Sequence, residues 1–340
     1  MANDLSDKKT TGRVTILDVA AAAGVSKSTV SRILDERLPR ASNPTADRVR
    51  QVAAELGYVR DVSAANLRRG TSLTLGMIVP RLTDTVMAML YESFARACAR
   101  RGRFAIVATT DDRPEAVRAA ADSLFNRGVD GLVLATTRTD DDFATELTNR
   151  GIPFVLALRG DGHSAASLGD DALGGWLATR HLIDLGHRHI ALIAGPEHAS
   201  NARGRVAGYH RAMAEAGLTV HPSWVVPSGF SIEAGADAVQ GILTLYPRPT
   251  AVFAVNDNTA IGAMSAIQRA GLKIPDDISL VGYNDIPLVS HLPMPLTSVR
   301  VPFDQIAAGA LDLLLAGSAT EQRIATPTLI PRATTAAPKR

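Results

Sequence analysis

Residues 14–35 read VTILDVAAAAGVSKSTVSRILD, and the spacing of the apolar letters in this stretch decides the fold of the first part of the chain. The helical period predicts one helix over residues 16–23 and a second over residues 27–35. Gly24 lies between them, where the chain needs a positive φ to turn sharply. The pattern is therefore that of two helices packed across a short turn.

The side chains around this turn suit close packing on one side and a polar partner on the other. Ala20 and Val30 are small enough for the helices to approach, and Val25 fills the space between them. Ser26 is expected to cap the second helix. The outer face of that helix is left polar, with Lys27, Ser28, Ser31 and Arg32. Such a face suits the major groove of DNA, where Arg and Lys bind guanine and Ser binds a base edge or phosphate. An ordinary helical hairpin with a solvated face would show it too.

A third helix is expected from Asn43 and Pro44, which form an N-cap followed by proline at the first helical position. It is expected to stop at Gly57. We therefore place a helix-turn-helix domain at residues 14–58, behind a polar segment 1–13 that is expected to be disordered. Residues 59–71 form a linker, part of which could make two turns of helix.

The charge of the chain is uneven. Residues 1–70 hold twelve Lys or Arg against eight Asp or Glu, a net of +4, whereas the whole chain of 340 residues carries +2. A basic first part on a near-neutral remainder is typical of a nucleic-acid-binding head. The single cysteine, Cys98, excludes an intramolecular disulfide and is expected to be buried. Residues 1–10 lack the apolar core of a secretory signal and no run of eighteen apolar residues exists, so we expect a cytoplasmic protein with no membrane partner.

Beyond residue 71, short apolar segments alternate with amphipathic stretches, and aromatic residues make up only 4% of the chain. Strands are expected at residues 73–79, 104–108, 131–135, 154–158, 190–193, 251–255 and 278–283. Helices are expected at residues 85–101, 114–127, 173–185, 203–216, 232–245 and 258–270. This alternation predicts an α/β fold with parallel sheets covered on both faces, divided into two lobes.

The first segment resembles the all-α head of the lactose/galactose-repressor (LacI/GalR) family. The family pattern T-x-x-D-V-A-x-x-A-G-V-S-x-x-T-V-S-R is matched at every fixed position from Thr15 to Arg32. The resemblance implies that Lys27, Ser28 and Arg32 contact bases. It extends the set of implied DNA-binding residues to Thr15, Ser26, Thr29 and Ser31.

The linker carries the same resemblance. Leu67 matches the hinge leucine that enters the minor groove at the centre of a palindromic operator, and Ala64 matches a small residue beside it. An apolar side chain inserted between base steps bends the DNA and widens the contact surface. A leucine packed on the body is the alternative interpretation of Leu67. The family usually has proline where this chain has Arg60, which leaves the ordering of the hinge helix open.

The remainder resembles the periplasmic-binding-protein-like core of the same family, so the likeness covers about residues 14–335. It is carried by segments such as LGHRHI at 185–190, FAVND at 253–257 and ISLVGY at 278–283. The core is expected at residues 72–335, before a tail at 336–340. Its N-terminal lobe would comprise about residues 72–169 and 300–318, and its C-terminal lobe about residues 170–299 and 319–335.

Two lobes around a cleft suit a small ligand. The resemblance places the lining of that cleft on Val86, Met87, Arg205, Phe230 and Asn256. Arginine offers a fork of donors to hydroxyls or a carboxylate, asparagine both donates and accepts, and phenylalanine gives an apolar face to a sugar ring. We therefore expect a sugar, sugar acid or sugar phosphate as effector.

Two further positions near the cleft carry alternatives. Asp84 could accept hydrogen bonds from ligand hydroxyls or cap a helix. Many relatives have aspartate at the place of Asn284, so the amide removes one negative charge and makes the cleft less hostile to an anionic ligand. Asp285 is expected to face solvent or the other lobe.

No catalytic residue, metal site or cofactor is expected. His181, His187 and His189 make no i, i+4 pair on a helix, and neither GxGxxG nor GxxxxGK[ST] occurs. The prediction is a ligand-responsive repressor that binds a double-stranded palindromic operator as a homodimer. Its rivals are a sugar-binding solute receptor without DNA function and a sugar-processing enzyme of α/β fold.

Overall fold

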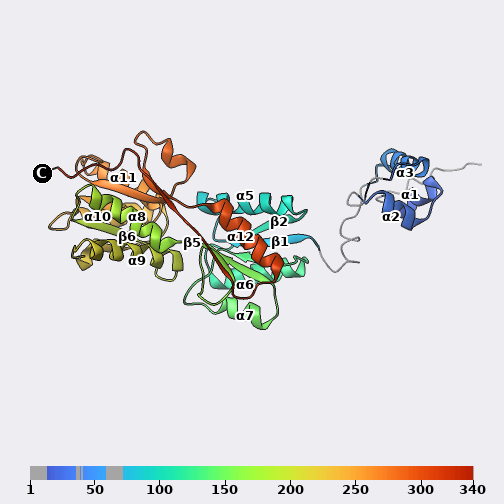
Figure 1. The fold of residues 1–340 in the computed structure, drawn as a ribbon, viewed down its shortest axis with the longest axis horizontal. Coiled ribbons are helices and arrows are strands. Elements are labelled where there is room, and N and C mark those ends of the chain that lie inside the picture. The colour runs from blue at the N-terminus through green and yellow to red at the C-terminus, as the bar shows by residue number, and fades with distance from the viewer. Residues whose placement is uncertain (1–13, 36–38, 40, 59–71, 340) are drawn as a thin grey trace, which may run out of the picture. The chain divides into compact units, whose positions relative to one another are not determined.

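The computed structural model describes residues 14–35, 39, 41–58 and 72–339. The chain divides into two compact units, Met1–Gly70 and Thr71–Arg340 (Figure 1). The expected hinge at residues 59–71, with Arg60, Ala64 and Leu67, lies outside the described residues.

The first unit contains the three predicted helices: α1 (Ile16–Ala23), α2 (Lys27–Ile33) and α3 (Pro44–Glu55). They pack around a small apolar core, whose buried members are Val19, Ala20, Ala23, Val30, Val49 and Ala53. The second helix ends two residues before the predicted boundary at 35. Because every core side chain is short, the three helices can approach closely, as the sequence requires of a helix-turn-helix.

The second unit begins with a lobe built on a six-stranded parallel sheet. Its strands lie in the order β11-β5-β4-β3-β1-β2. Their bounds are β1 (Thr74–Val79), β2 (Phe104–Thr109), β3 (Leu132–Leu134), β4 (Phe154–Ala157), β5 (Ala166–Gly169) and β11 (Gln322–Ala325). Helices α5 (Thr85–Arg100) and α12 (Phe303–Ala316) pack together on one face. Helices α6 (Pro114–Asn126) and α7 (Phe143–Asn149) share an apolar cluster with the sheet on the other face.

The other lobe repeats this plan. Its sheet has the order β12-β10-β9-β8-β6-β7, and only the β10–β12 pair is antiparallel. The strands are β6 (Ile190–Ala194), β7 (Val225–Pro227), β8 (Ala251–Ala254), β9 (Ser279–Asn284), β10 (Thr297–Arg300) and β12 (Thr328–Ile330). Helix α8 (Asp171–Asp184) packs on α9 (Ser200–Glu215), and α10 (Ile232–Leu243) packs on α11 (Asp257–Arg269). Because crossovers between parallel strands are right-handed as a rule, the strand order is expected to place these two pairs on opposite faces of the sheet.

The chain passes between the lobes three times, after β5, after β10 and after β11. The first two passages agree with the expected breaks near residues 169 and 300. The expected third break at about residue 319 is wrong, because β11 pairs in parallel with β5 of the first sheet. The third passage therefore follows Ala325. Where β5 ends, the Asp170 N–H donates to the Ala325 carbonyl over 2.9 Å, so two of the passages are bonded to each other.

All seven predicted strands of the second unit are present within one or two residues of their expected bounds. Strands β5, β7, β10 and β11 and helices α7 and α12 were not predicted from the apolar pattern, and β12 covers Leu329 and Ile330, which resemble the family's closing strand. Among the described residues, no helix combines the length and apolar character needed to span a membrane.

Candidate functional site

The turn of the first unit is held by its caps. The Thr15 hydroxyl and backbone N–H both donate to the Asp18 carboxylate over 2.7 Å, which closes a capping box at the start of α1. Gly24 has φ of +63° and ends that helix, as its position in the sequence predicts. Ser26 caps α2 by accepting from the Thr29 N–H over 3.2 Å. These bonds fix the angle at which α2 leaves the turn.

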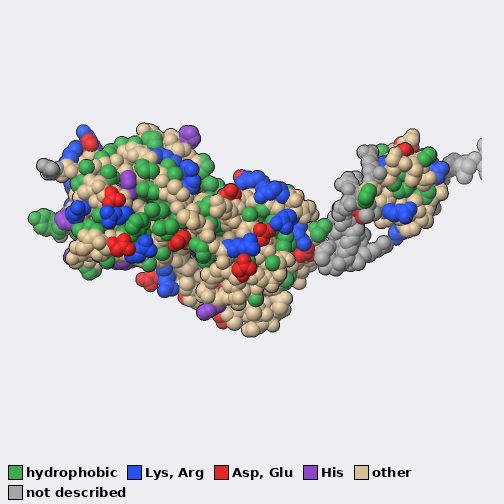
Figure 2. All heavy atoms as spheres, viewed as in Figure 1, with side chains coloured by type: hydrophobic (Ala, Val, Ile, Leu, Met, Phe, Trp, Pro, Cys, Tyr) green, Lys and Arg blue, Asp and Glu red, His purple; other side chains and the backbone are tan. Residues whose placement is uncertain are grey.

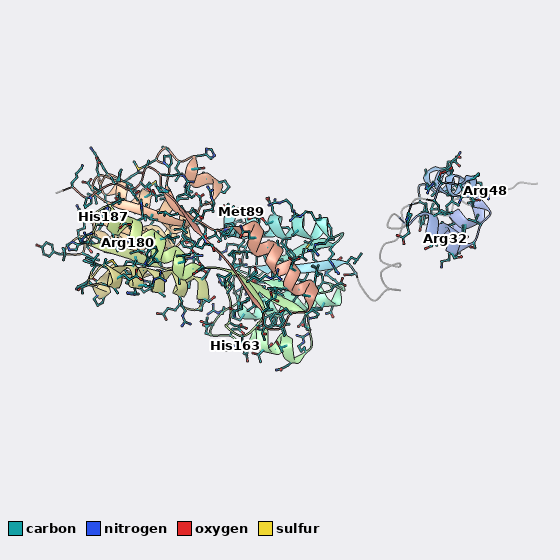
Figure 3. All side chains as sticks on the ribbon, in the orientation of Figure 1. Arg32, Arg48, Met89, His163, Arg180 and His187 are labelled. Atoms are coloured by element: carbon teal, nitrogen blue, oxygen red, sulfur yellow. The ribbon has the colours of Figure 1, made fainter. Side chains whose placement is uncertain are left out.

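The exposed face of α2 carries the residues expected to contact bases. Lys27, Ser28 and Arg32 are exposed, whereas Thr29 and Ser31 are half-buried. Arg32, labelled in Figure 3, lies in the last turn of α2. The side chains of Lys27 and Arg32 make no hydrogen bond or ion pair with the described residues, so both are available to an external acceptor.

The hydroxyls expected to bind DNA divide into two groups. Those of Thr15 and Ser26 are already used in caps, and Ser26 Oγ also lies 2.8 Å from both Ser28 Oγ and Thr29 Oγ1. Positioning of the helix is therefore a role that the structure gives directly to Thr15 and Ser26. Ser28 keeps an exposed hydroxyl at the start of the helix.

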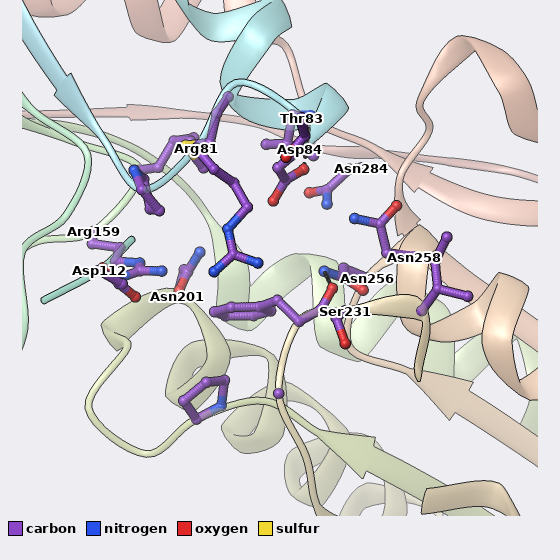
Figure 4. A pocket seen from close by; sticks show the side chains of 18 of the residues that line it. Arg81, Thr83, Asp84, Asp112, Arg159, Asn201, Ser231, Asn256, Asn258 and Asn284 are labelled. Atoms are coloured by element: carbon purple, nitrogen blue, oxygen red, sulfur yellow. Dashed lines mark hydrogen bonds and ion pairs between the residues drawn. The ribbon is translucent and has the colours of Figure 1, made fainter. Parts of the chain in front are cut away.

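The second unit contains a cavity of about 580 Å³ between its two lobes (Figure 4). It lies at the carboxyl ends of strands from both sheets, where α/β folds bind ligands. The structure brings all seven predicted effector residues to this one cavity: Asp84, Val86, Met87, Arg205, Phe230, Asn256 and Asn284. Its size suits a small molecule of the monosaccharide to disaccharide range.

Arg205 is fixed by three contacts from the floor of the cavity. Its Nε donates to Asp171 Oδ1 over 2.8 Å, and its Nη1 donates to the Val255 carbonyl over 2.8 Å. The guanidinium carbon lies 3.8 Å from the ring centroid of Tyr283. Burial raises the pKa of Asp171, while Arg205 acts in the opposite direction. The planar guanidinium is thus held in one orientation, with Nη2 left for a ligand.

The side-chain amide of Asn256 already makes two hydrogen bonds within the protein. Its Oδ1 caps α11 by accepting from the Thr259 N–H over 2.8 Å, and its Nδ2 donates to the Phe230 carbonyl over 3.0 Å. The amide therefore positions the segment that carries Phe230. A second acceptor site on Oδ1 and the other N–H of the amide stay free for a ligand.

Asp84 caps a helix and also lines the cavity. Oδ1 caps α5 by accepting from the Val86 N–H over 3.1 Å, while the same residue lines the cavity. Burial raises the pKa of this carboxyl, partly offset by the Val86 N–H and by Arg81. Figure 4 shows Asp84 from one lobe and Asn258 and Asn284 from the other around the same space.

The expected orientation of Asp285 is wrong. Asn284 and Asp285 have φ of +105° and +54°, and this turn sends their side chains to different places. Asn284 lines the cavity, whereas the Asp285 carboxylate is 3% exposed and pairs with Arg300 and Arg332 of its own lobe over 2.7 Å each. Arg300 at the end of β10 and Arg332, two residues past β12, hold Asp285 inside the lobe, so it faces neither solvent nor the other lobe.

Several polar residues of the cavity were missed by sequence reasoning. They lie in loops after strands or in the first turn of the helix that follows, where apolar periodicity gives no signal: Arg81, Thr83, Asp112, Arg159, Asn201, Ser231, Glu233 and Asn258. Arg159 is 3% exposed, and its Nη1 lies 3.0 Å from both carboxylate oxygens of Asp112. A polar or charged residue directly after each predicted strand was the available clue.

The histidines lie apart from the cavity. His187 is buried and bonds Thr250, Ser279 and the Ala336 carbonyl, while His181 bonds Thr335. His189 stacks on Trp224 at 5.2 Å. Within the described residues, no group of three or more His, Cys, Asp or Glu side chains could hold a metal ion. Burial raises the pKa of the Cys98 thiol to about 11, which makes it an inert core residue.

The visible face of the second unit shows Lys and Arg interspersed with Asp and Glu rather than gathered in a single basic patch (Figure 2). The lobes therefore offer no broad electrostatic surface of one sign on that face. In the second unit, polar side chains converge at the cavity between the lobes.

Known sequence families match both parts of the chain. The model for bacterial regulatory proteins of the lacI family matches residues 15–61. The model for a periplasmic-binding-protein-like domain matches residues 179–335. The first match covers the helix-turn-helix, and the second covers most of the C-terminal lobe together with α12, β11 and β12.

Whole-chain relatives have the same two parts. The chain is 35% identical to the ribose operon repressor of Escherichia coli, over 93% of this chain and 94% of that protein. It is 34% identical to the HTH-type transcriptional repressor PurR of Vibrio campbellii, over 88% of this chain and 91% of the relative. Among solved structures, the lac repressor dimer bound to operator and the anti-inducer ONPF aligns with a TM-score of 0.86 and 28% identity, over 96% of this chain and 100% of that one.

Proposed function

The chain belongs to the lacI family of bacterial regulatory proteins, and we propose that it is a transcriptional repressor that binds a palindromic operator as a homodimer and responds to a sugar-like effector. The observation that carries this proposal is the presence, in one chain, of a helix with an exposed basic face and a polar cavity between two lobes. Its relatives are repressors and not enzymes. Regulation of transcription places its action in the cytoplasm.

DNA recognition is assigned to α2 and the hinge. Lys27, Ser28 and Arg32 project to base edges, with Arg32 suited to guanine because its fork can donate two parallel hydrogen bonds. Thr15, Ser26, Thr29 and Ser31 orient the helix or contact phosphate. In the hinge, Leu67 enters the minor groove beside Ala64, and a flexible pyrimidine–purine step would deform there at least cost.

The effector is assigned to the cavity between the lobes. Asp84, Val86 and Met87 contribute from one lobe, and Arg205, Phe230, Asn256 and Asn284 from the other. A ligand held by both lobes favours one relative position of the lobes over another. Operator affinity changes only to the extent that the ligand binds these two states with different affinity.

The test of DNA recognition is selection of duplexes from a random library by the full-length protein, followed by binding assays. We expect enrichment of a two-fold symmetric sequence, because a two-fold dimer reads a two-fold site. Arg32→Gln should weaken binding to the selected site by about tenfold or more. Arg248→Gln removes the same charge from an exposed position of the other unit and should leave binding within about twofold.

A failure to enrich any sequence would overturn the proposal and favour the solute receptor. Enrichment of an asymmetric site would keep the DNA-binding function but remove the palindromic dimer from it.

A further inference from the structure

The cavity between the lobes has an unusual balance of charge. Three arginines line it: Arg81, Arg159 and Arg205. Two of them have carboxylate partners inside the protein, since Arg159 pairs with Asp112 and Arg205 pairs with Asp171. These two pairs are close to neutral. Outside them, the lining carries the cation of Arg81 and two carboxylates, those of Asp84 and of the exposed Glu233.

Arg81 lies two residues past the end of β1, and Figure 4 shows it extending into the cavity. Its side chain makes no hydrogen bond and no ion pair with any residue that the structure describes. The nearest acid in sequence, Asp84, uses one oxygen to cap α5. The N–H groups of this guanidinium are therefore free to donate hydrogen bonds to a ligand in the cavity.

Arg159 supplies further unused donors in the same cavity. The residue is 3% exposed, and only its Nη1 has an acceptor in the described part of the chain, the Asp112 carboxylate. Its Nε is buried with no hydrogen-bond partner. The guanidinium also lies over the ring of Phe230, 5.5 Å from its centroid, so this cation of one lobe touches the other lobe. An unsatisfied buried donor of this kind costs free energy unless a ligand or water accepts from it.

The rest of the lining has a different chemistry. Asp84, Asn258 and Asn284 provide one carboxylate and two amides, which suit hydroxyl groups that both donate and accept. Asn284 is 5% exposed and carries no charge, so it does not repel an anion. The cavity therefore offers hydroxyl-binding groups together with an unpaired cation.

We propose that the effector is an anionic sugar derivative, whose carboxylate or phosphate is bound by Arg81 and Arg159 while its hydroxyls bind Asp84, Asn258 and Asn284. This inference rests on the proposed effector function of the cavity and adds the charge of the ligand to it. Charge-assisted hydrogen bonds from guanidinium groups are among the strongest with which proteins recognise carboxylates and phosphates. Burial of Arg159 strengthens its interaction with an anion, whereas Arg81 is exposed and free to reach one.

The experiment measures binding to the full-length protein by calorimetry. The probes are matched sets of a neutral sugar, its aldonic acid and its phosphate: D-ribose, D-ribonate and D-ribose 5-phosphate, and D-glucose, D-gluconate and D-glucose 6-phosphate. In a separate assay, the melting temperature of the protein is measured in inorganic phosphate or sulfate and compared with that in chloride at equal ionic strength. The acid and phosphate members separate the two sources of the negative charge.

We expect the tightest probe to be anionic and to bind at least about tenfold tighter than its neutral parent. Arg81→Gln should remove that preference while changing the affinity of the neutral parent by less than about twofold. Arg248→Gln, an exposed arginine outside the cavity, should keep the preference. Inorganic phosphate should raise the melting temperature of the wild type more than that of Arg81→Gln.

A neutral sugar that binds most tightly, with equal affinity for wild type and Arg81→Gln, would overturn the proposal. So would an equal phosphate-induced shift in both proteins when no sugar probe binds. If a neutral sugar changes operator affinity, the proposed function stands and only the anionic effector is wrong. If the protein selects no DNA at all, the repressor function fails, while the phosphate comparison still reports on Arg81.

Discussion

His187 shows how one buried side chain connects distant parts of the chain. Its Nδ1 lies 2.8 Å from Thr250 Oγ1, and its Nε2 lies 2.9 Å from the Ala336 carbonyl and 3.1 Å from Ser279 Oγ. A carbonyl can only accept, so Nε2 carries the proton and Nδ1 accepts from Thr250. The neutral imidazole thereby fastens residue 336 to β9.

The bonding of His187 predicts an effect of acid on stability. Burial lowers the pKa of this imidazole below its ordinary value of 6.5. The unfolded chain therefore binds a proton more readily than the folded one, and stability is lost as the pH falls below about 6.5. In His187→Gln this contribution is absent, so the stability gap between wild type and variant should be smaller at pH 5.5 than at pH 7.5, both values chosen to bracket that pKa.

Urea unfolding at the two pH values measures this gap. His181 and His198 titrate in both proteins and cancel in the comparison. A gap that is constant or widens in acid would show that His187 is not held neutral.

At the scale of single residues, the sequence predicted which side chains meet at the cavity but not what they do there. The seven predicted effector residues converge, because the resemblance fixes their places at strand ends and in the helices that follow strands. The caps made by Asp84 and Asn256 and the inward pairing of Asp285 depend on backbone angles and on partners from other strands. Arg81 and Arg159 lie in loops, where composition alone does not distinguish a ligand-binding arginine from a solvated one.

Helices α8 and α9 illustrate the next scale, because their contact sets the place of Arg205. A Cβ on Gly175 would lie 2.2 Å from the backbone carbonyl oxygen of Arg205, and one on Gly208 would lie 2.1 Å from that of Ala172. Only glycine at these positions lets the two backbones approach so closely. The orientation of the Arg205 guanidinium toward Asp171 follows from that approach.

We expect Gly175→Ala to lower the free energy of unfolding by about 2–3 kcal/mol, since the added methyl group meets backbone that cannot move aside. Effector affinity should fall with it, because the helix that carries Arg205 must shift. Gly241→Ala is the matched control, as its Cβ would meet nothing within 4 Å. That change should raise stability by about 0.5–1 kcal/mol through the helical preference of alanine.

Urea unfolding of the two variants and the wild type checks both values. A Gly175→Ala protein as stable as the wild type would mean that α8 and α9 pack less tightly than described.

At the scale of elements, long periodic segments were predictable and short ones were not. Helices α1, α5 and α11 lie within a residue or two of their expected bounds, because caps and apolar spacing agree there. Strands β5 (ASLG) and β11 (QRIA) are four residues each with polar letters, so they carry no apolar run. Their pairing with each other, rather than their own composition, makes them strands.

The two lobes of the second unit touch across the cavity as well as through the connecting passages. The Gly160 N–H of one lobe donates to Ser200 Oγ of the other over 2.9 Å. The Thr139 N–H donates to the His198 carbonyl over 2.9 Å. These bonds belong to the relative position of the lobes seen in the structure, and any change in that position must break or re-form them.

Ser200→Ala tests whether an effector uses this position. Removal of one hydrogen bond across the lobes should lower effector affinity by about two- to tenfold if the ligand-bound state retains that bond. Calorimetry with the tightest probe of the sugar panel measures the change. Ser290→Ala, which removes a hydroxyl that donates to the nearby Pro287 carbonyl and to no other described residue, serves as the control. Equal affinity of wild type and Ser200→Ala would mean that the ligand binds without this contact.

For the whole molecule, the resemblance predicted two units and two lobes. The alternation of short apolar segments with amphipathic ones predicted that the sheets are parallel. The third passage was misplaced because QRIA of β11 gives no sign of which sheet it joins. β11 joins the first sheet because the edge of β5 offers backbone N–H and C=O groups to pair with, and that edge exists only once the lobe has folded.

The three passages also determine the order in which the protein can fold as it leaves the ribosome. Helices α1 to α3 are contiguous in sequence and can fold once residue 58 has emerged. The first lobe needs α12 and β11, and the second needs β12 and Thr334, which is fully buried against Leu280 and Thr297. Neither lobe can be completed before almost the entire polypeptide has been synthesised. A nascent chain is therefore expected to display a finished DNA-reading head while its sensing lobes still expose unpaired strands, the stage at which chaperones would be needed.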